Sequence, residues 1–171
     1  MSGACDSHTC SLQITTAPTA RRRRSPQPKH RTSFASAANA GKPLSGRVLL
    51  VDHDQDFQQL AQSLLSDAGA TVETIDNGRR AFEMALLAQA RNNPYQLVLI
   101  DHDLPDWSGC STTQRLREAG YRLPIVGLSD RCSSMVRQQF LAAGCESLIL
   151  KPIHDDLLIV QLTAWLNATS N

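Results

Sequence analysis

The chain has 171 residues, a length that predicts one domain plus additional residues outside it, and a formal net charge of +1. The charge is uneven: residues 1–45 carry seven Lys and Arg and one Asp, whereas residues 46–171 carry ten Lys and Arg against fifteen Asp and Glu. Without an apolar run of membrane-spanning length or a signal-peptide core, we expect a cytoplasmic protein with no membrane partner. The five cysteines form no CxxC pair, which favours reduced structural thiols.

Residues 1–45 are rich in Ser, Thr, Ala and Pro and have almost no periodic apolar residues. We therefore expect a disordered basic tail there. The arginine run Arg21–Arg24 leaves two interpretations open: a solvated tail, or a patch that binds nucleic acid or another acidic surface. Steeply salt-dependent DNA binding that is lost on deletion of residues 1–45 would indicate the second interpretation.

From Gly46 onward, short apolar runs alternate with amphipathic segments. We expect strands at 47–52, 70–75, 95–101, 123–129 and 147–151, and helices at 56–68, 79–91, 111–119, 132–143 and 153–167. In the helix at 132–143, we expect Met135, Val136, Phe140 and Leu141 to face inward. This alternation predicts one domain over residues 46–168, with a parallel sheet and helices on both of its faces.

The predicted strand at 70–75 alternates between apolar and polar residues, which suits a sheet edge, whereas the other four are continuously apolar. This favours a doubly wound α/β fold with five parallel strands in the flavodoxin-like order 2-1-3-4-5. The functional crevice of such a sheet lies at the carboxyl ends of the strands, near the first and third.

Polar residues collect at those predicted strand ends. They are Asp52, His53 and Asp54 after the first strand, Asp101 and Asp103 at the third, Ser129 at the fourth, and Lys151, the one lysine in residues 46–171, at the fifth. Clustered carboxylates need a cation, and oxygen ligands suit Mg²⁺. Asp101 is placed to accept a phosphoryl group as a nucleophile, while Ser129 and Lys151 would hold the phosphoryl oxygens.

The stretches LVLIDHDLPDWSG (97–109), LPIVGLS (123–129) and LILKP (148–152) resemble the response regulator receiver domain of two-component signalling. The resemblance covers about residues 46–168. It implies that a histidine kinase or histidine phosphotransfer protein phosphorylates Asp101, with Ser129 and Lys151 assisting. It also implies Mg²⁺ held by Asp52, Asp101 and the backbone carbonyl of Asp103, and a cis peptide bond before Pro152.

The resemblance implies an enzyme only in the sense of self-phosphorylation and slow self-dephosphorylation at Asp101. We expect a stand-alone receiver with no output domain. Because dimers are common in the family, the resemblance leaves open whether the chain forms a homodimer. The alternative is a pseudo-receiver, a protein-interaction module that works without phosphorylation. Trp107 is either a partner contact or a lid over Asp101.

Three positions depart from the family pattern. His53 stands where the family has a second acid, and since imidazole suits transition metals better, we expect weakened Mg²⁺ binding, with either His53 or Asp54 completing the site. Asp130 replaces a small residue, and it either repels an incoming phosphoryl group or pairs with Arg131. Leu148 replaces the aromatic residue that couples phosphorylation to the output face.

Overall fold

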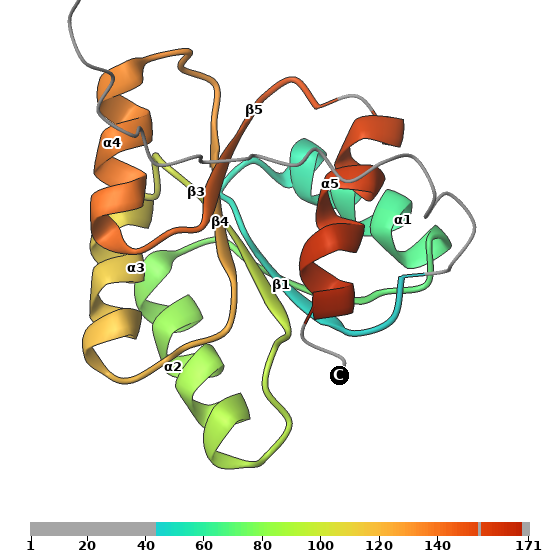
Figure 1. Ribbon diagram of the computed structural model, residues 1–171, viewed down its shortest axis with the longest axis horizontal. Helices are drawn as coiled ribbons and strands as arrows, with labels where there is room; N and C mark the ends of the chain where they lie inside the picture. The colour runs from blue at the N-terminus through green and yellow to red at the C-terminus, as the bar shows by residue number, and fades with distance from the viewer. Residues whose placement is uncertain (1–43, 154, 169–171) are drawn as a thin grey trace, which may run out of the picture. The chain divides into compact units, whose positions relative to one another are not determined.

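A computed structural model describes residues 44–153 and 155–168 (Figure 1). The strands are β1 (Arg47–Val51), β2 (Thr71–Ile75), β3 (Leu97–Asp101), β4 (Ile125–Ser129) and β5 (Ser147–Leu150). The helices are α1 (Gln55–Asp67), α2 (Gly78–Ala90), α3 (Gly109–Glu118), α4 (Ser134–Ala143) and α5 (Asp155–Ala168). Each bound lies within two residues of its prediction. Of the predicted tail at residues 1–45, positions 1–43, with Arg21–Arg24, lie outside the described residues.

The five strands form one parallel sheet in the order β2-β1-β3-β4-β5, which confirms the predicted topology. All five residues of β3 are buried, whereas the edge strand β2 has an exposed first residue and two half-buried ones. The chain leaves β1 toward one edge and returns beside it as β3. The carboxyl ends of β1 and β3 therefore mark the switch point where such sheets place their functional crevice.

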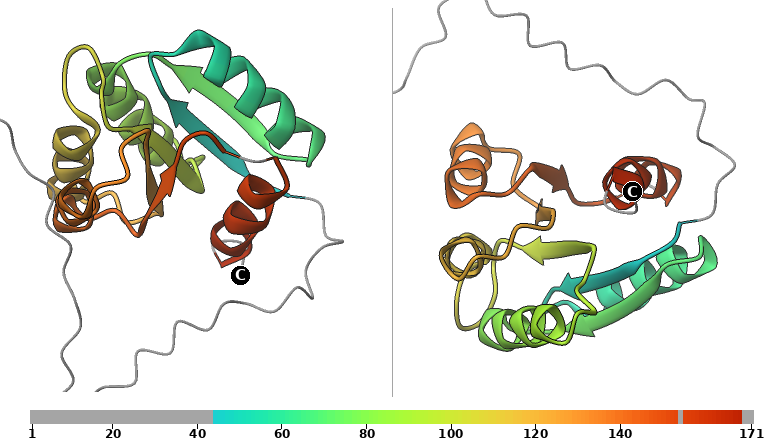
Figure 2. Two further views of the ribbon diagram at one scale, coloured as in Figure 1. Left: turned by 90° about the horizontal axis from the view of Figure 1, so that it is seen from above. Right: turned by 60° about the horizontal axis from the view of Figure 1, so that its bottom comes forward.

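The helices cover both faces of the sheet, with α1 and α5 on one face and α2, α3 and α4 on the other (Figure 1, Figure 2). Alternate strand residues supply the two apolar clusters. Leu49 and Ile100 belong to the cluster under α2, α3 and α4, and Leu50 and Leu99 to the cluster under α1 and α5. Leu44 extends the second cluster ahead of β1, and its N–H donates to the Ala68 carbonyl at 2.7 Å.

The prediction that Met135 and Leu141 face inward is wrong. Val136 and Phe140 form the buried stripe of α4, while Met135 is 67% and Leu141 46% exposed. A helix advances about 100° per residue, so Met135 and Leu141 lie roughly 120° to either side of that stripe. The buried face of α4 is narrower than the set of apolar residues in the helix, so apolar side chains beside that face stay exposed.

Two glycines permit the close packing that positions the end of β3 and helix α4. A Cβ on Gly109 would lie 2.1 Å from the Asp101 carbonyl oxygen, and the Gly109 N–H donates to the His102 carbonyl at 3.1 Å. A Cβ on Gly127 would lie 2.7 Å from the Phe140 ring. The chain thus folds back directly over Asp101, and α4 rests directly on β4.

Candidate functional site

The predicted site residues come from four neighbouring strands. Asp52 follows β1, Asp101 ends β3, Ser129 ends β4 and Lys151 follows β5. The Lys151 ammonium donates to Asp52 Oδ2 at 2.5 Å and to Asp101 Oδ1 at 2.8 Å. Because β5 is two strands away from β3, about 10 Å at the usual strand spacing, only a long side chain can reach across.

The two carboxylates are buried, with Asp52 fully inaccessible and Asp101 5% exposed. Burial raises the pKa of Asp52 above its ordinary value, and its bonds to Lys151 and to the Asp54 N–H offset only part of that effect. Burial alone would lower the pKa of Lys151, but its bonds to Asp101 and Asp52 raise it overall. The lysine is therefore held as a cation between the carboxylates.

A residue that the sequence did not single out for the site also holds Lys151. Its ammonium lies 4.3 Å from the centroid of the Phe57 ring on α1, in a cation–π arrangement. Phe57 is partly buried and packs against the apolar cluster under α1 and α5. The sequence could have indicated the contact with Lys151, because Phe57 lies in the first turn of α1, directly after the acidic residues that follow β1. That turn starts at the carboxyl edge of the sheet.

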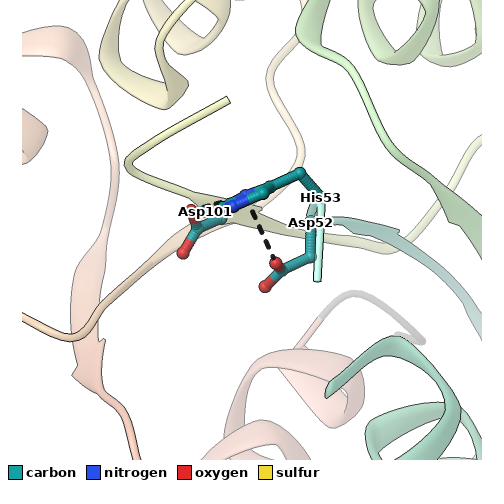
Figure 3. Close-up of side chains that lie close together, drawn as sticks. All are labelled: Asp52, His53 and Asp101. Atoms are coloured by element: carbon teal, nitrogen blue, oxygen red, sulfur yellow. Dashed lines mark ion pairs between the residues drawn. The ribbon is translucent and has the colours of Figure 1, made fainter. Parts of the chain in front are cut away.

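The side chains of His53 and Asp54 point to different partners. His53 Nδ1 lies 3.8 Å from Asp101 Oδ2 and 4.0 Å from Asp52 Oδ1, and Figure 3 shows the ring turned toward both carboxylates. The Asp54 side chain instead accepts hydrogen bonds from the N–H groups of Asp56 and Phe57, as the N-cap of α1. Of the two residues left open by the sequence, His53 is the one that faces the carboxylates.

The loops after β3 and β4 are joined by an ion pair. Arg131 lies 2.9 Å from Asp103 Oδ2 and 3.9 Å from Asp130 Oδ1. The backbone N–H of Arg131 donates to the Ser129 hydroxyl at 3.1 Å, and the Ser129 side chain is buried. The predicted pairing of Asp130 with Arg131 is thus weaker than the pairing of Asp103, which the sequence did not suggest because the two residues lie on different loops.

The structure also shows the surroundings of three further residues named from the sequence, which are Asp103, Leu148 and Trp107. The Asp103 N–H donates to Asp101 Oδ2 at 2.9 Å, while the metal-binding role of its carbonyl stays a prediction. Leu148 is buried on β5, and the Lys151–Pro152 peptide bond is cis, as the resemblance implies. The Trp107 ring packs against Phe82 of α2 and beneath the Arg115 guanidinium of α3, which does not match a lid over Asp101.

The donor set can be tested against a divalent cation. Asp52, His53 and Asp101 each offer one ligand atom, and these atoms lie within 4.8 Å of one another. The two carboxylate oxygens fit Mg²⁺, which takes oxygen ligands and bound water. The imidazole nitrogen does not fit this preference, because it is a ligand that Zn²⁺, Ni²⁺ and other transition ions favour.

The comparisons with known proteins agree on one family. The family model for the response regulator receiver domain matches residues 48–163. The transcriptional regulatory protein DltR of Streptococcus agalactiae is 32% identical over 116 residues, covering 68% of this chain and 50% of DltR. The cell cycle transcriptional regulator CtrA of Caulobacter vibrioides is 30% identical over 118 residues, covering 69% of this chain and 49% of CtrA.

The solved structure of the Vibrio cholerae chemotaxis protein CheY4 superposes with a TM-score of 0.63 at 27% identity, covering 71% of this chain and 99% of CheY4. The chain belongs to the response regulator receiver domain family. It spans about half the length of DltR and CtrA. None of the helices in residues 44–153 and 155–168 combines the length and the apolar composition that crossing a lipid bilayer requires.

Proposed function

We propose that Asp101 accepts a phosphoryl group from a phosphohistidine of a histidine kinase or histidine phosphotransfer protein. The observation that carries the proposal is the Lys151 ammonium, which donates to both Asp52 and Asp101 at the carboxyl edge of the sheet. A lysine fixed there supplies positive charge beside the place that the phosphoryl oxygens would occupy. The family's role in two-component signalling supports the same function.

In the proposed step, a carboxylate oxygen of Asp101 bonds to phosphorus while the P–N bond of the phosphohistidine breaks and its imidazole leaves with the electron pair. Lys151 and the Ser129 hydroxyl would stabilise charge on the transferred oxygens. When bound, Mg²⁺ would neutralise further charge there, held by Asp52, Asp101 and the Asp103 carbonyl. Attack of water on the acyl phosphate would release phosphate and regenerate Asp101.

The test is incubation of the full chain with acetyl phosphate and a divalent cation, in parallel samples with Mg²⁺ and Co²⁺, followed by intact-mass measurement. We expect the addition of one phosphoryl group to the wild type and none to Asp101→Asn. Asp67→Asn is the matched control, because Asp67 is exposed at the last residue of α1, and this variant should be modified like the wild type. An unmodified wild type in both samples, or modification that persists in Asp101→Asn, contradicts the proposal.

The second candidate is a pseudo-receiver that binds a partner without being phosphorylated. The observation in its favour is the His53 imidazole, which faces the carboxylates where the family pattern has a metal-binding acid. For this candidate we expect Asp101→Asn to bind a partner kinase domain as tightly as the wild type does. The phosphoacceptor function instead requires that treatment with acetyl phosphate changes the affinity of the wild type and leaves that of Asp101→Asn unchanged.

The stand-alone form, the cytoplasmic location and the homodimer stay predictions. The homodimer is tested by sedimentation velocity of the full chain with and without acetyl phosphate. A shift toward a faster-sedimenting species after treatment would support pairing that depends on phosphorylation. The same treatment of Asp101→Asn should then leave the sedimentation profile unchanged.

A further inference from the structure

We infer that His53 makes this site selective for a divalent first-row transition ion over Mg²⁺. The inference deepens the proposed function. Only the role of the bound ion in phosphoryl transfer rests on that function. The ion preference itself is a property of three converging donor atoms, from Asp52, His53 and Asp101. It can therefore be measured without any phosphoryl transfer.

The geometry of the three donors is close to that of a coordination shell. His53 Nδ1 lies 4.0 Å from Asp52 Oδ1 and 3.8 Å from Asp101 Oδ2. Ligands bound at roughly 2.1 Å to one ion lie roughly 3.0–3.5 Å apart, so the cluster has to contract by about 1 Å. The His53 side chain is 56% exposed, so its ring can move that far without disturbing the core.

The oxygens that face His53 are the ones that Lys151 does not engage. Lys151 donates to Asp52 Oδ2 and Asp101 Oδ1, which leaves Asp52 Oδ1 and Asp101 Oδ2 toward the imidazole. Each of these accepts one backbone N–H, from Asp54 and Asp103 respectively, and a carboxylate oxygen can accept a second partner. Two buried carboxylates beside one ammonium leave a negative charge that a cation would balance.

The identity of the third donor selects the ion. Mg²⁺ prefers an octahedron of oxygen ligands and gains little from imidazole. Zn²⁺, Co²⁺ and Ni²⁺ bind imidazole well and accept carboxylate oxygens beside it. Since the Asp54 carboxylate is engaged at the N-terminus of α1, it does not replace the missing acid. Phosphoryl transfer to Asp101 would then respond to a transition ion more strongly than to Mg²⁺.

The test is isothermal titration calorimetry of the full chain with Co²⁺ and, separately, with Mg²⁺. Three proteins are compared: the wild type, His53→Asp, and His102→Gln as a matched control at a neighbouring histidine that bonds Asp103 instead. We expect His53→Asp to weaken Co²⁺ binding by on the order of tenfold or more and to strengthen Mg²⁺ binding. His102→Gln should keep the wild-type preference.

The visible absorption of bound Co²⁺ provides an independent readout, because it reports ligand type and separates imidazole from cysteine thiolate ligation. We expect a thiolate-free spectrum that changes in His53→Asp. An unchanged ratio of Co²⁺ to Mg²⁺ affinity in His53→Asp, loss of Co²⁺ binding in His102→Gln, or a thiolate spectrum overturns the inference. His53→Asn should weaken Co²⁺ binding as His53→Asp does, and circular dichroism checks that both variants fold.

The two proposals fail separately. If Asp101 is never phosphorylated but His53→Asp exchanges Co²⁺ preference for Mg²⁺ preference, the phosphoacceptor function is wrong and the ion preference holds. If Asp101 is phosphorylated equally well with either ion and the affinity ratio does not depend on His53, the receiver function holds and the ion preference is wrong.

Discussion

Lys151 is the residue on which the charge balance of the site depends. Its ammonium donates to two carboxylates that are almost inaccessible to solvent, and its own side chain is 16% exposed. Removing one partner from a buried ion pair leaves uncompensated charge, which is strongly destabilising. We expect Lys151→Ala to lower the free energy of unfolding by about 3 kcal/mol at neutral pH, measured by urea denaturation.

Two controls connect that loss to charge rather than to lost packing against Phe57. In Lys151→Ala combined with Asp52→Asn, one of the two facing charges is gone, so much of the lost stability should return. The loss should also shrink as the pH falls from about 7 toward about 5, because one carboxyl can then take up a proton. A loss that is the same at both pH values and in the double variant would show that packing dominates.

Asp52 gives a separate prediction about pH. Its pKa in the folded state lies above the ordinary value of 3.8, chiefly because it is buried. The folded protein therefore binds this proton more tightly than the unfolded chain, so protonation of Asp52 favours folding as the pH falls through the raised pKa. At neutral pH, where Asp52 is charged, we expect Asp52→Asn to be at least as stable as the wild type.

The stability difference between Asp52→Asn and the wild type should narrow as the pH falls toward 3.8, because the wild-type carboxyl then becomes neutral as well. Thermal denaturation of both proteins across this range measures the difference. Titrating groups that lie far from Asp52 contribute equally to the two proteins, so their contributions cancel to a good approximation. If the wild type instead loses stability relative to Asp52→Asn as the pH falls, the pKa of Asp52 is lowered by Lys151 and not raised by burial.

At the residue scale, the sequence predicted that Asp101 and Lys151 lie at the same edge of the sheet, because parallel strands end on one edge. It could not decide between His53 and Asp54. That choice depends on backbone direction at the start of α1, where the Asp54 side chain turns to cap the helix. The pairing of Asp103 with Arg131 was missed for the same reason, since it depends on where two separate loops lie in space.

Among the elements, β4 and α4 are in unusually close contact. A Cβ on Gly127 would lie 2.7 Å from the Phe140 ring, closer than side-chain atoms can approach. Phe140 also meets the His102 ring edge-on, with the ring centroids 5.7 Å apart. We expect Gly127→Ala to lower the free energy of unfolding by about 2 kcal/mol, because it overpacks this contact. Urea denaturation followed by circular dichroism measures the change.

The matched control is the double variant with Phe140→Leu, whose smaller side chain makes room for the added methyl group. Phe140→Leu alone should be destabilising, because it leaves a cavity. The double variant should lose less stability than the two single losses added together, since the defects compensate. Strict additivity would mean that the Gly127 methyl group is accommodated without displacing Phe140.

At the element scale, the order and type of all ten elements followed from the sequence because apolar runs and turn residues alternate clearly along residues 46–168. The inward faces of the helices were harder to predict. Met135 is apolar but exposed because the stripe through Val136 and Phe140 alone faces the sheet. The width of that stripe depends on the position of the helix against the sheet, which periodicity does not contain.

For the molecule as a whole, the central sheet links two separate apolar clusters. Trp107 packs against Phe82, which borders the cluster under α2, α3 and α4, whereas Trp165 packs against the cluster under α1 and α5. Both clusters draw alternate residues from the same strands, so neither can lose its packing alone. We expect the described domain to unfold in a single cooperative transition.

The two tryptophans make this testable, because each reports one face of the sheet. In Trp107→Phe the remaining Trp165 reports the face of α1 and α5, and in Trp165→Phe the remaining Trp107 reports the other face. Within each variant, the urea midpoint from fluorescence should coincide with that from far-ultraviolet circular dichroism. Separate midpoints in either variant would show that one face melts before the other.

The central claim is that Asp101 is the phosphoacceptor, and the most direct test is to locate the phosphoryl group in the chain. The full chain is treated with acetyl phosphate and a divalent cation, reduced with borohydride to convert an aspartyl phosphate to homoserine, and digested for peptide mass spectrometry. We expect homoserine at position 101 and an unmodified Asp52 and Asp103. Homoserine at either of those two residues, or none anywhere in the chain, would contradict the claim.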